Sequence, residues 1–316
     1  MILVLLTHDR GVIDETAMQS LTAARGMEDE IQVVTVGVEV TGLGDQGVTA
    51  HHIIRHPDLD DYSPSAWGVA LAQLAETLSP TAIVAMGSEK GNEVMAHVGA
   101  ATGLPMVANC VSVDVTENPW KLTRTRWGGS LLEETTLDSP MKLITFTEHV
   151  FEAGAAISST TVSVSDFVPA LKTTDLVTKV VDRVLTADGV TLATSPVVVS
   201  GGRGVGSPEG FAPLEELAGL LGGVVGCSRV VTNNGWRPHS DQVGQTGTVI
   251  APDVYIACGI SGAIQHWVGM MASKTIIAIN TDAEAPMVTK ADYAVIGDLA
   301  EIVPAIVEEV RARTGR

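Results

Sequence analysis

Short apolar runs alternate with amphipathic segments along the first hundred residues. The runs at residues 2–7, 31–38 and 82–86 are continuous and rich in Ile, Leu, Val and Ala, which is typical of strands buried on both faces of a parallel sheet. Apolar positions recur at helical spacing in residues 64–78, which start with a proline, and a second helix is expected at 92–102. This alternation predicts a parallel sheet with helices on its faces.

The pattern changes after Pro105. Four shorter strands are expected, at residues 111–115, 120–127, 131–136 and 142–147, with Gly128-Gly129 as a hairpin signal. We therefore expect an α/β first domain that is doubly wound and nucleotide-binding-like, with an antiparallel extension. Its first strand is not followed by GxGxxG, so no cofactor is expected in this domain.

A change of composition marks the domain boundary. Residues 186–195 are the best linker candidate, because they contain an Asp-Gly pair and end before a proline. Residues 177–185 could form a last strand of the first domain, and residues 152–168 are typical of a loop or weak strand. We expect an N-terminal domain over residues 1–190 and a C-terminal domain over residues 196–316.

The C-terminal domain repeats the alternation. A strand at residues 197–199 leads through a glycine-rich turn into a helix at 211–221. Further elements are expected as strands at 249–257, 275–279 and 293–296 and as helices at 263–271 and 299–313. The strand, glycine turn and helix would bring backbone amides to a phosphate, although a plain tight crossover gives the same pattern.

Two glycine-bracketed polar loops stand out in this domain, at residues 242–247 and 258–266. Glycines allow a ligand to approach backbone amides closely, and the loops carry an unusually rich set of polar side chains. The second loop precedes the predicted helix at 263–271, whose N-terminus would offer unpaired N–H groups to an anion. Asn280 and Asp298 follow strand ends, where doubly wound sheets bind ligands. The sequence therefore predicts a phosphate or cofactor site.

The charge balance narrows the classes of partner. The 316 residues contain 37 acidic and 19 basic residues, a net charge of −18. Such a surface argues against binding to nucleic acid and to an anionic membrane. No apolar run approaches the ~20 residues that span a bilayer, so no membrane insertion is expected.

Neither a metal site nor a disulfide framework is expected. The three cysteines, Cys110, Cys227 and Cys258, have no metal-ligand spacing and fit small buried residues in a reducing compartment. His51, His52 and His56 could bind a metal on paper, but a proline interrupts the helix that this spacing needs, so exposed loop histidines are expected. The chain opens on an apolar strand without a basic signal segment, which predicts a cytoplasmic protein.

Several motifs in order resemble the α subunit of electron transfer flavoprotein. They are Ser-Gly-Gly-Arg-Gly at 200–204, Cys-Ser-Arg at 227–229, Val-Gly-Gln-Thr-Gly at 243–247, Gly-Ile-Ser-Gly-Ala-Ile-Gln-His at 259–266, Ala-Ile-Asn at 278–280 and Ala-Asp-Tyr at 291–293. The resemblance is dense from about residue 197 to residue 310 and weak before it. It implies that FAD is bound in the C-terminal domain.

The resemblance also implies roles for particular residues. The cofactor-binding residues would be Arg203, Ser228, Arg229, Gln242, Val243, Gly244, Gln245, Thr246, Gly247, Gly259, Ser261, Gly262, Ala263, Ile264, Gln265, His266, Asn280 and Asp298. Thr246 would hydrogen-bond the flavin N5, Arg229 would lie against the flavin ring, and His266 would donate to the pyrimidine carbonyl. Ser228 would bind phosphate and Arg203 the pyrophosphate or flavin edge, while Asn280 and Asp298 would hold the adenosine end. Without the resemblance, Arg229 could equally be a solvated arginine, Thr246 could be a hydrogen-bonded turn residue, and a histidine at 266 is more often structural or exposed. The glycines around Arg203 favour a functional role for it over a surface arginine.

The function implied is an electron carrier rather than a self-contained enzyme, since no catalytic acid–base pair or nucleophile triad stands out. The subunit would form a heterodimer with an electron transfer flavoprotein β subunit. It would take electrons from a flavin dehydrogenase of the acyl-CoA dehydrogenase type and pass them to a quinone reductase or other redox acceptor. The alternatives are an electron-bifurcating flavoprotein using NADH, a self-sufficient NAD-binding oxidoreductase, and a regulatory nucleotide-binding subunit.

Overall fold

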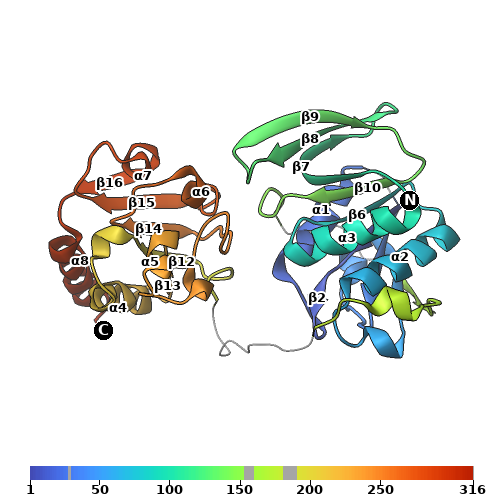
Figure 1. Cartoon of the computed structure of the whole chain (residues 1–316), viewed down its shortest axis with the longest axis horizontal. Helices are drawn as coiled ribbons and strands as arrows, with labels where there is room; N and C mark the ends of the chain where they lie inside the picture. Colours follow the sequence, from blue (N-terminus) through green and yellow to red (C-terminus); the bar gives the residue numbers. More distant parts are fainter. Residues whose placement is uncertain (28–29, 153–159, 181–190, 316) are drawn as a thin grey trace. The chain divides into compact units, whose positions relative to one another are not determined.

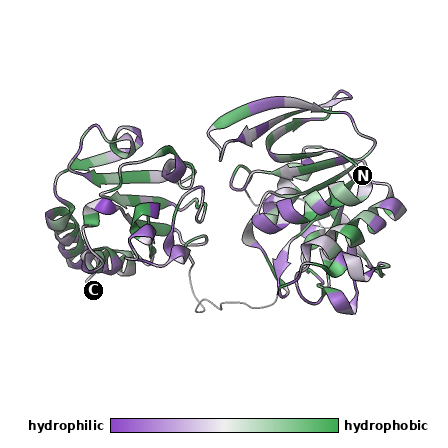
Figure 2. Ribbon diagram, in the orientation of Figure 1, coloured by the Kyte–Doolittle hydropathy of each residue, from purple (hydrophilic) through white to green (hydrophobic). Residues whose placement is uncertain are grey.

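The computed structural model describes residues 1–27, 30–152, 160–180 and 191–315. The chain divides into two compact units, one built from Met1–Trp127 and Leu131–Leu185 and the other containing Thr186–Arg316. Each unit has its own hydrophobic core on both faces of its own sheet. Figure 2 shows the apolar residues concentrated on the strands and on the helix faces turned toward them.

A nine-stranded sheet forms the first unit (Figure 1). Across the sheet, the strands are β11 (Ser163–Phe167), β5 (Val48–Ile54), β4 (Ile31–Val36), β1 (Ile2–Leu5), β6 (Ala82–Met86), β10 (Lys142–Phe146), β7 (Met106–Asp114), β8 (Trp120–Arg126) and β9 (Leu131–Leu137). All neighbours pair in parallel from β11 to β7, whereas β8 is antiparallel to both β7 and β9. The predicted doubly wound sheet with an antiparallel extension is therefore confirmed.

Helices cover both faces of this sheet. α1 (Gln19–Arg25) packs on one face through Leu21 and Ala24. α2 (Pro64–Leu78) and α3 (Glu89–Thr102) pack on the other through residues such as Leu71 and Val94. The predicted start of α2 at Pro64 is confirmed, while α3 begins three residues earlier than expected because the Ser88 side chain caps it by accepting from the Gly91 amide.

The histidines at 51 and 52 correct the sequence prediction. They belong to β5, a strand that we did not predict, and His51 is fully buried, with Nε2 2.8 Å from the Thr35 hydroxyl. Burial lowers the pKa of His51. Only His56 lies in a loop, where its Nδ1 accepts a hydrogen bond from the Asp58 amide. Residues 152–168 were expected to form a loop or weak strand, and the part of this range that the structure describes contains β11. Residues 177–180 form no strand, while residues 153–159 and 181–185 lie outside the described residues.

The second unit is a five-stranded, entirely parallel sheet (Figure 1). Across it lie β13 (Val224–Cys227), β12 (Val197–Gly201), β14 (Val254–Cys258), β15 (Thr275–Asn280) and β16 (Tyr293–Ile296). The core on one face includes residues of α4 (Ala212–Leu220), α5 (Arg229–Asn233) and α8 (Leu299–Thr314). The core on the other face includes residues of α6 (Ile264–Trp267) and α7 (Pro286–Lys290).

Two predicted elements of this unit are shorter than expected. The strand expected at 249–257 starts only at Val254, and the helix expected at 263–271 is the single turn of α6 followed by turns. At Gly269 the backbone packs directly on Gly244, and its carbonyl accepts from the Ile250 amide instead of from a following helical turn. β13, α5 and α7 were not predicted.

The structure agrees with the interpretation of the cysteines as small buried residues. All three are free and buried, and burial raises the pKa of each thiol to about 12. Within the described ranges, no group of three His, Cys, Asp or Glu side chains is arranged to hold a metal ion. In the same residues, no helix combines the length and the apolar character needed to cross a bilayer.

Candidate functional site

The strand order of the second unit fixes where a ligand can bind. β12 and β14 are neighbours, but the helices that follow them in the chain, α4 and α6, contribute to the cores on opposite faces of the sheet. Loops leaving two such strands diverge and open a crevice at the carboxyl edge of the sheet. A cavity of about 590 Å³ lies at this point, a size typical of cofactor sites.

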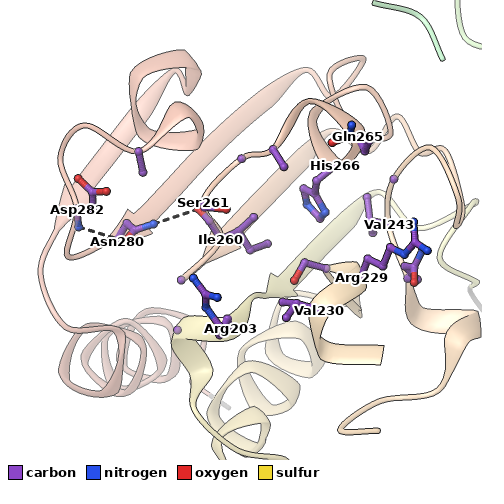
Figure 3. Close-up of a pocket in the computed structure, with 18 of the residues that line it drawn as sticks. Arg203, Arg229, Val230, Val243, Ile260, Ser261, Gln265, His266, Asn280 and Asp282 are labelled. Atoms are coloured by element: carbon purple, nitrogen blue, oxygen red, sulfur yellow. Dashed lines mark hydrogen bonds between the residues drawn. The ribbon is translucent and has the colours of Figure 1, made fainter. Parts of the chain in front are cut away.

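Residues that follow four successive strands of the sheet line the cavity (Figure 3). They are Arg203 and Gly204 after β12, Ser228, Arg229 and Val230 after β13, Gln242, Val243, Gly244 and Thr246 in the next loop, Gly259, Ile260, Ser261, Gly262, Ala263, Gln265 and His266 after β14, and Asn280, Asp282 and Ala285 around the end of β15. The structure thus brings most of the predicted site residues together.

Four of the predicted residues do not line the cavity. Gln245 and Ile264 are exposed beside it, and the Gln245 amide donates to the Gln265 carbonyl. Gly247 packs against the carbonyl of Gln242, and the Asp298 carboxylate caps α8 by accepting from the Ala300 amide.

Five lining residues were missed by the sequence analysis: Gly204, Val230, Ile260, Asp282 and Ala285. Gly204 and Ile260 belong to motifs that the sequence analysis quotes, and Val230 and Asp282 lie within two positions of a predicted site residue. Ala285 carries no such signal.

Close backbone contacts explain two of the glycines. Gly202 and Gly204 pack on the loop after β14, where the Gly204 amide donates to the Gly259 carbonyl at 3.1 Å. A Cβ on Gly202 would lie 2.2 Å from that carbonyl oxygen, and a Cβ on Gly204 would lie 2.8 Å from the Gly259 Cα. A larger residue at either position would push apart the two loops that form the cavity floor.

Ser228 and His266 each have a buried polar atom without a well-aligned hydrogen bond among the described residues, although the Val243 backbone lies beside the His266 ring. The Ser228 Oγ and the His266 Nδ1 are both inaccessible to solvent, and both residues line the cavity. An unsatisfied buried polar atom costs about 1–3 kcal/mol, and such atoms are rare in native structures. Both residues belong to the cavity wall, but neither of these two atoms is itself exposed to the cavity.

His266 is held as a neutral imidazole. Its Nε2 lies 2.7 Å from the hydroxyl of Tyr255, which is fully buried, and burial lowers the pKa of His266 to about 4. Burial also raises the pKa of the Tyr255 hydroxyl, which keeps that group protonated. A neutral imidazole carries one proton, and Tyr255 therefore governs which ring nitrogen can donate into the cavity.

The site is suited to an anionic ligand although the chain is acidic. The guanidinium groups of Arg203 and Arg229 lie on the cavity (Figure 3). Gly262 and Ala263 also line it, and neither backbone amide donates a hydrogen bond to another described residue. Arginine side chains and unpaired amides are the groups that bind phosphate in proteins.

The opposite end of the cavity is formed after β15. The Asn280 side chain donates to the Ile260 carbonyl at 3.0 Å, and its Oδ1 accepts from the Asp282 amide at 3.1 Å (Figure 3). These bonds tie the loops after β14 and β15 together, and the Asp282 side chain also lines the cavity. The lining therefore extends from a histidine and an arginine at one end to an amide and a carboxylate at the other.

Comparison with known proteins agrees with this geometry. Residues 2–172 match the electron transfer flavoprotein domain, and residues 191–271 match the electron transfer flavoprotein FAD-binding domain. The second match contains most of the cavity lining, from Arg203 to His266.

Curated relatives match over nearly their whole length. The electron transfer flavoprotein subunit alpha of Mycobacterium leprae is 36% identical, with 99% of each chain covered. That of Thermoanaerobacterium thermosaccharolyticum is 33% identical over 95% of this chain and 94% of the relative. Protein FixB of Bradyrhizobium diazoefficiens is also 33% identical, over 96% of this chain and 87% of the relative.

Proposed function

Because this chain belongs to the electron transfer flavoprotein α-subunit family, we propose that it holds FAD in the cavity of its second unit and carries electrons between two redox partners. FAD is the cofactor of the domain that residues 191–271 match. When bound, FAD supplies the redox chemistry, and the protein contributes binding, orientation and electrostatics.

The observation that carries the proposal is the cavity at the switch point of the parallel sheet, whose wall contains Arg203 and Arg229. Ser228 and His266 line the same cavity, as do Gly262 and Ala263, whose backbone amides donate to no described residue. A dinucleotide offers acceptors for all of these groups along its length. The donor set and the cavity therefore fit FAD.

We assign the phosphate end of the site to Arg203, Ser228 and the amides of Gly262 and Ala263. Each of these residues lines the cavity and has a hydrogen-bond donor. The adenosine end is assigned to Asn280 and Asp298, as the resemblance implies. Asp282 is added because it lines the cavity beside Asn280.

The flavin end is assigned to Arg229, Thr246 and His266. A fixed positive charge at Arg229 lowers the free-energy cost of adding electrons nearby. His266 is neutral, so it acts as a hydrogen-bond partner rather than as a second cation. Val243, Gly244 and Gln265 complete the wall around the ring.

The partners are inferred from the family alone. The subunit would pair with an electron transfer flavoprotein β subunit through its N-terminal domain, residues 1–190, and residues 196–316 would hold FAD. Electrons would come from a flavin dehydrogenase, of which the acyl-CoA dehydrogenase type is our first candidate, and leave to a quinone reductase or another acceptor. Relatives named electron transfer flavoprotein subunit alpha and Protein FixB have similar identities to this chain, so donors other than acyl-CoA dehydrogenases are included in the test.

The test is the visible spectrum of the chain purified with its β-type partner, followed during anaerobic reduction. We expect one FAD per α chain, reduced by a dehydrogenase and its substrate and not by NADH alone. A second flavin that NADH reduces would move the proposal to the electron-bifurcating version. A colourless complex that does not take up added FAD would contradict FAD binding and would turn attention to NAD.

A further inference from the structure

A hydrogen-bonded chain of three side chains ends at the cavity. The carboxamide of Gln242, which is only 2% exposed, lies between two threonine hydroxyls. Its Oε1 is 2.7 Å from the Oγ1 of Thr232 on α5, and its Nε2 is 2.9 Å from the Oγ1 of Thr246 on the cavity wall. The Thr232 hydroxyl is also 2.9 Å from the Arg229 carbonyl. Both residues line the cavity, but Thr246 is exposed whereas Gln242 is almost completely buried.

Backbone hydrogen bonds and close packing hold the main chain of Gln242 in place, so it does not adjust to changes in the side-chain hydrogen bonds. Its amide donates to the His239 carbonyl at 3.0 Å, and its carbonyl accepts from the Thr248 amide at 2.7 Å. Gly247 packs so closely that a Cβ there would lie 2.1 Å from the same carbonyl oxygen. Rotation of the terminal carboxamide is therefore the motion left to this residue, and that torsion is soft and two-fold.

The carboxamide has two orientations in which its oxygen and its nitrogen are each hydrogen-bonded to one of the two threonine hydroxyls. In the first, the Thr232 hydroxyl donates to Oε1, Nε2 donates to Thr246, and the Thr246 proton points into the cavity. In the second, the amide is turned over: Nε2 donates to Thr232, whose proton goes to the Arg229 carbonyl, and Oε1 accepts the Thr246 proton. The first orientation makes Thr246 a donor toward the cavity and the second makes it an acceptor.

We propose that Gln242 is a positioning residue that turns over its carboxamide when the cofactor changes oxidation state, and so reverses the hydrogen bond that Thr246 makes. This rests on the proposed function, which places the Thr246 hydroxyl beside the flavin N5. That nitrogen is an acceptor in oxidised FAD and carries an N–H in fully reduced FAD, so it needs a donor in one state and an acceptor in the other. No covalent bond of the protein changes. Three hydrogen bonds reverse their direction, and the Thr232 hydroxyl donates to the Arg229 carbonyl instead of to Gln242.

Gln73 on α2 provides a matched control. Its Nε2 donates to the Ala170 carbonyl at 2.9 Å, and its Oε1 accepts from the Ala170 amide at 2.8 Å. These two backbone partners have fixed and opposite roles, because a carbonyl only accepts and an amide only donates. The Gln73 carboxamide therefore has one satisfied orientation, whereas the Gln242 carboxamide has two.

The test is a reduced-minus-oxidised infrared difference spectrum of the FAD-loaded complex made with [5-¹³C]glutamine. We expect a shift of one glutamine C=O band on reduction, because the oxygen exchanges one threonine donor for the other. The band pair should be lost in Gln242→Met and in Gln242→Glu, the second variant keeping an acceptor for both threonines in case the first does not fold. It should remain in Gln73→Met.

Two results would overturn the proposal: flavin bands that change on reduction without any shift of a glutamine band, or a glutamine shift that persists in both Gln242 variants and so belongs to Gln245 or Gln265. If the wild-type spectrum contained no flavin bands, FAD binding itself would be contradicted. Failure of the proposed function can therefore be told apart from failure of the Gln242 proposal, in which the flavin bands are present.

Discussion

Individual residues of the cavity are constrained more by what surrounds them than by their own chemistry. Gly204 is exposed, yet it allows the loop after β12 to touch the loop after β14. Its substitution therefore reports on whether the two loops must be in contact for binding.

We expect Gly204→Ala to weaken FAD binding and to lower the free energy of unfolding by about 1–3 kcal/mol, since the new Cβ would meet the Gly259 backbone at 2.8 Å. Gly219→Ala is the control: this glycine is exposed in α4, and a Cβ added there would have no other atom within 4 Å. It should leave FAD binding unchanged and stabilise by about 0.5–1 kcal/mol. Isothermal FAD titration and chemical denaturation measure both quantities, and equal FAD affinity in the two variants would contradict the tight loop contact.

His266 predicts a pH dependence of stability in the FAD-free chain. Its pKa is about 4 in the folded protein and near 6.5 when unfolded, so between these values the unfolded state binds the extra proton. The free energy of unfolding should therefore fall as the pH is lowered from 6.5 to 4, by about 3 kcal/mol from this group. His266→Gln should flatten this part of the profile for the second unit, and His239→Gln, which changes an exposed side chain, should not. If the free energy of unfolding depended on pH in the same way in the wild type and in His266→Gln, the pKa of His266 would not differ between the folded and unfolded states, and the prediction would be wrong.

At the scale of elements, the bounds of a helix or strand were predicted best where its pattern of apolar residues was uninterrupted. β6 and β16 lie at the predicted bounds, and α8 ends one residue beyond its predicted end. β5 was missed because its two histidines suggested a polar loop, yet the hydroxyl of Thr35 on β4 satisfies one ring nitrogen of His51 and allows its burial. β13 was missed because its four residues include a glycine and follow two more, a composition typical of turns.

The site itself was predictable because its residues are contiguous in short glycine-bracketed loops. Position in the sequence alone could not separate Thr246, which lines the cavity, from its neighbours Gln245 and Gly247, which do not. That separation depends on which way each residue faces. The partners of Gln242 also require the fold, because Thr232 is ten residues away on an unpredicted helix.

Arg237 holds the segment between α5 and Gln242 in place through its side-chain contacts. Its guanidinium binds Asp241 at 2.8 Å and Glu215 on α4, and it lies 5.4 Å from the centre of the Phe211 ring. The side chain is only 20% exposed, so these contacts are worth more than an ordinary surface ion pair.

We expect Arg237→Met to cost ~2 kcal/mol of stability and to weaken FAD binding, because the loop that leads into Gln242 loses its anchor. Arg311→Met removes an ion pair with Glu216 in which the arginine is more than half exposed, and it should cost less than about 1 kcal/mol without changing FAD binding. Thermal denaturation and FAD titration of both variants test this. Identical losses from both variants would mean that Arg237 is an ordinary surface residue.

At the scale of the whole molecule, the two units have separate cores, and the cavity is lined by residues of the second unit alone. A ligand that binds only the folded state stabilises the unit that binds it, by about 2.7 kcal/mol at a hundred times its Kd. Calorimetry of the isolated chain should therefore resolve two transitions, of which only one shifts upward when FAD is added. In Gly204→Ala the FAD-dependent shift should shrink at the same FAD concentration, while the other transition stays in place. A single transition that moves as a whole with FAD would mean that the two units unfold cooperatively, and the binding energy would then be shared by the entire chain.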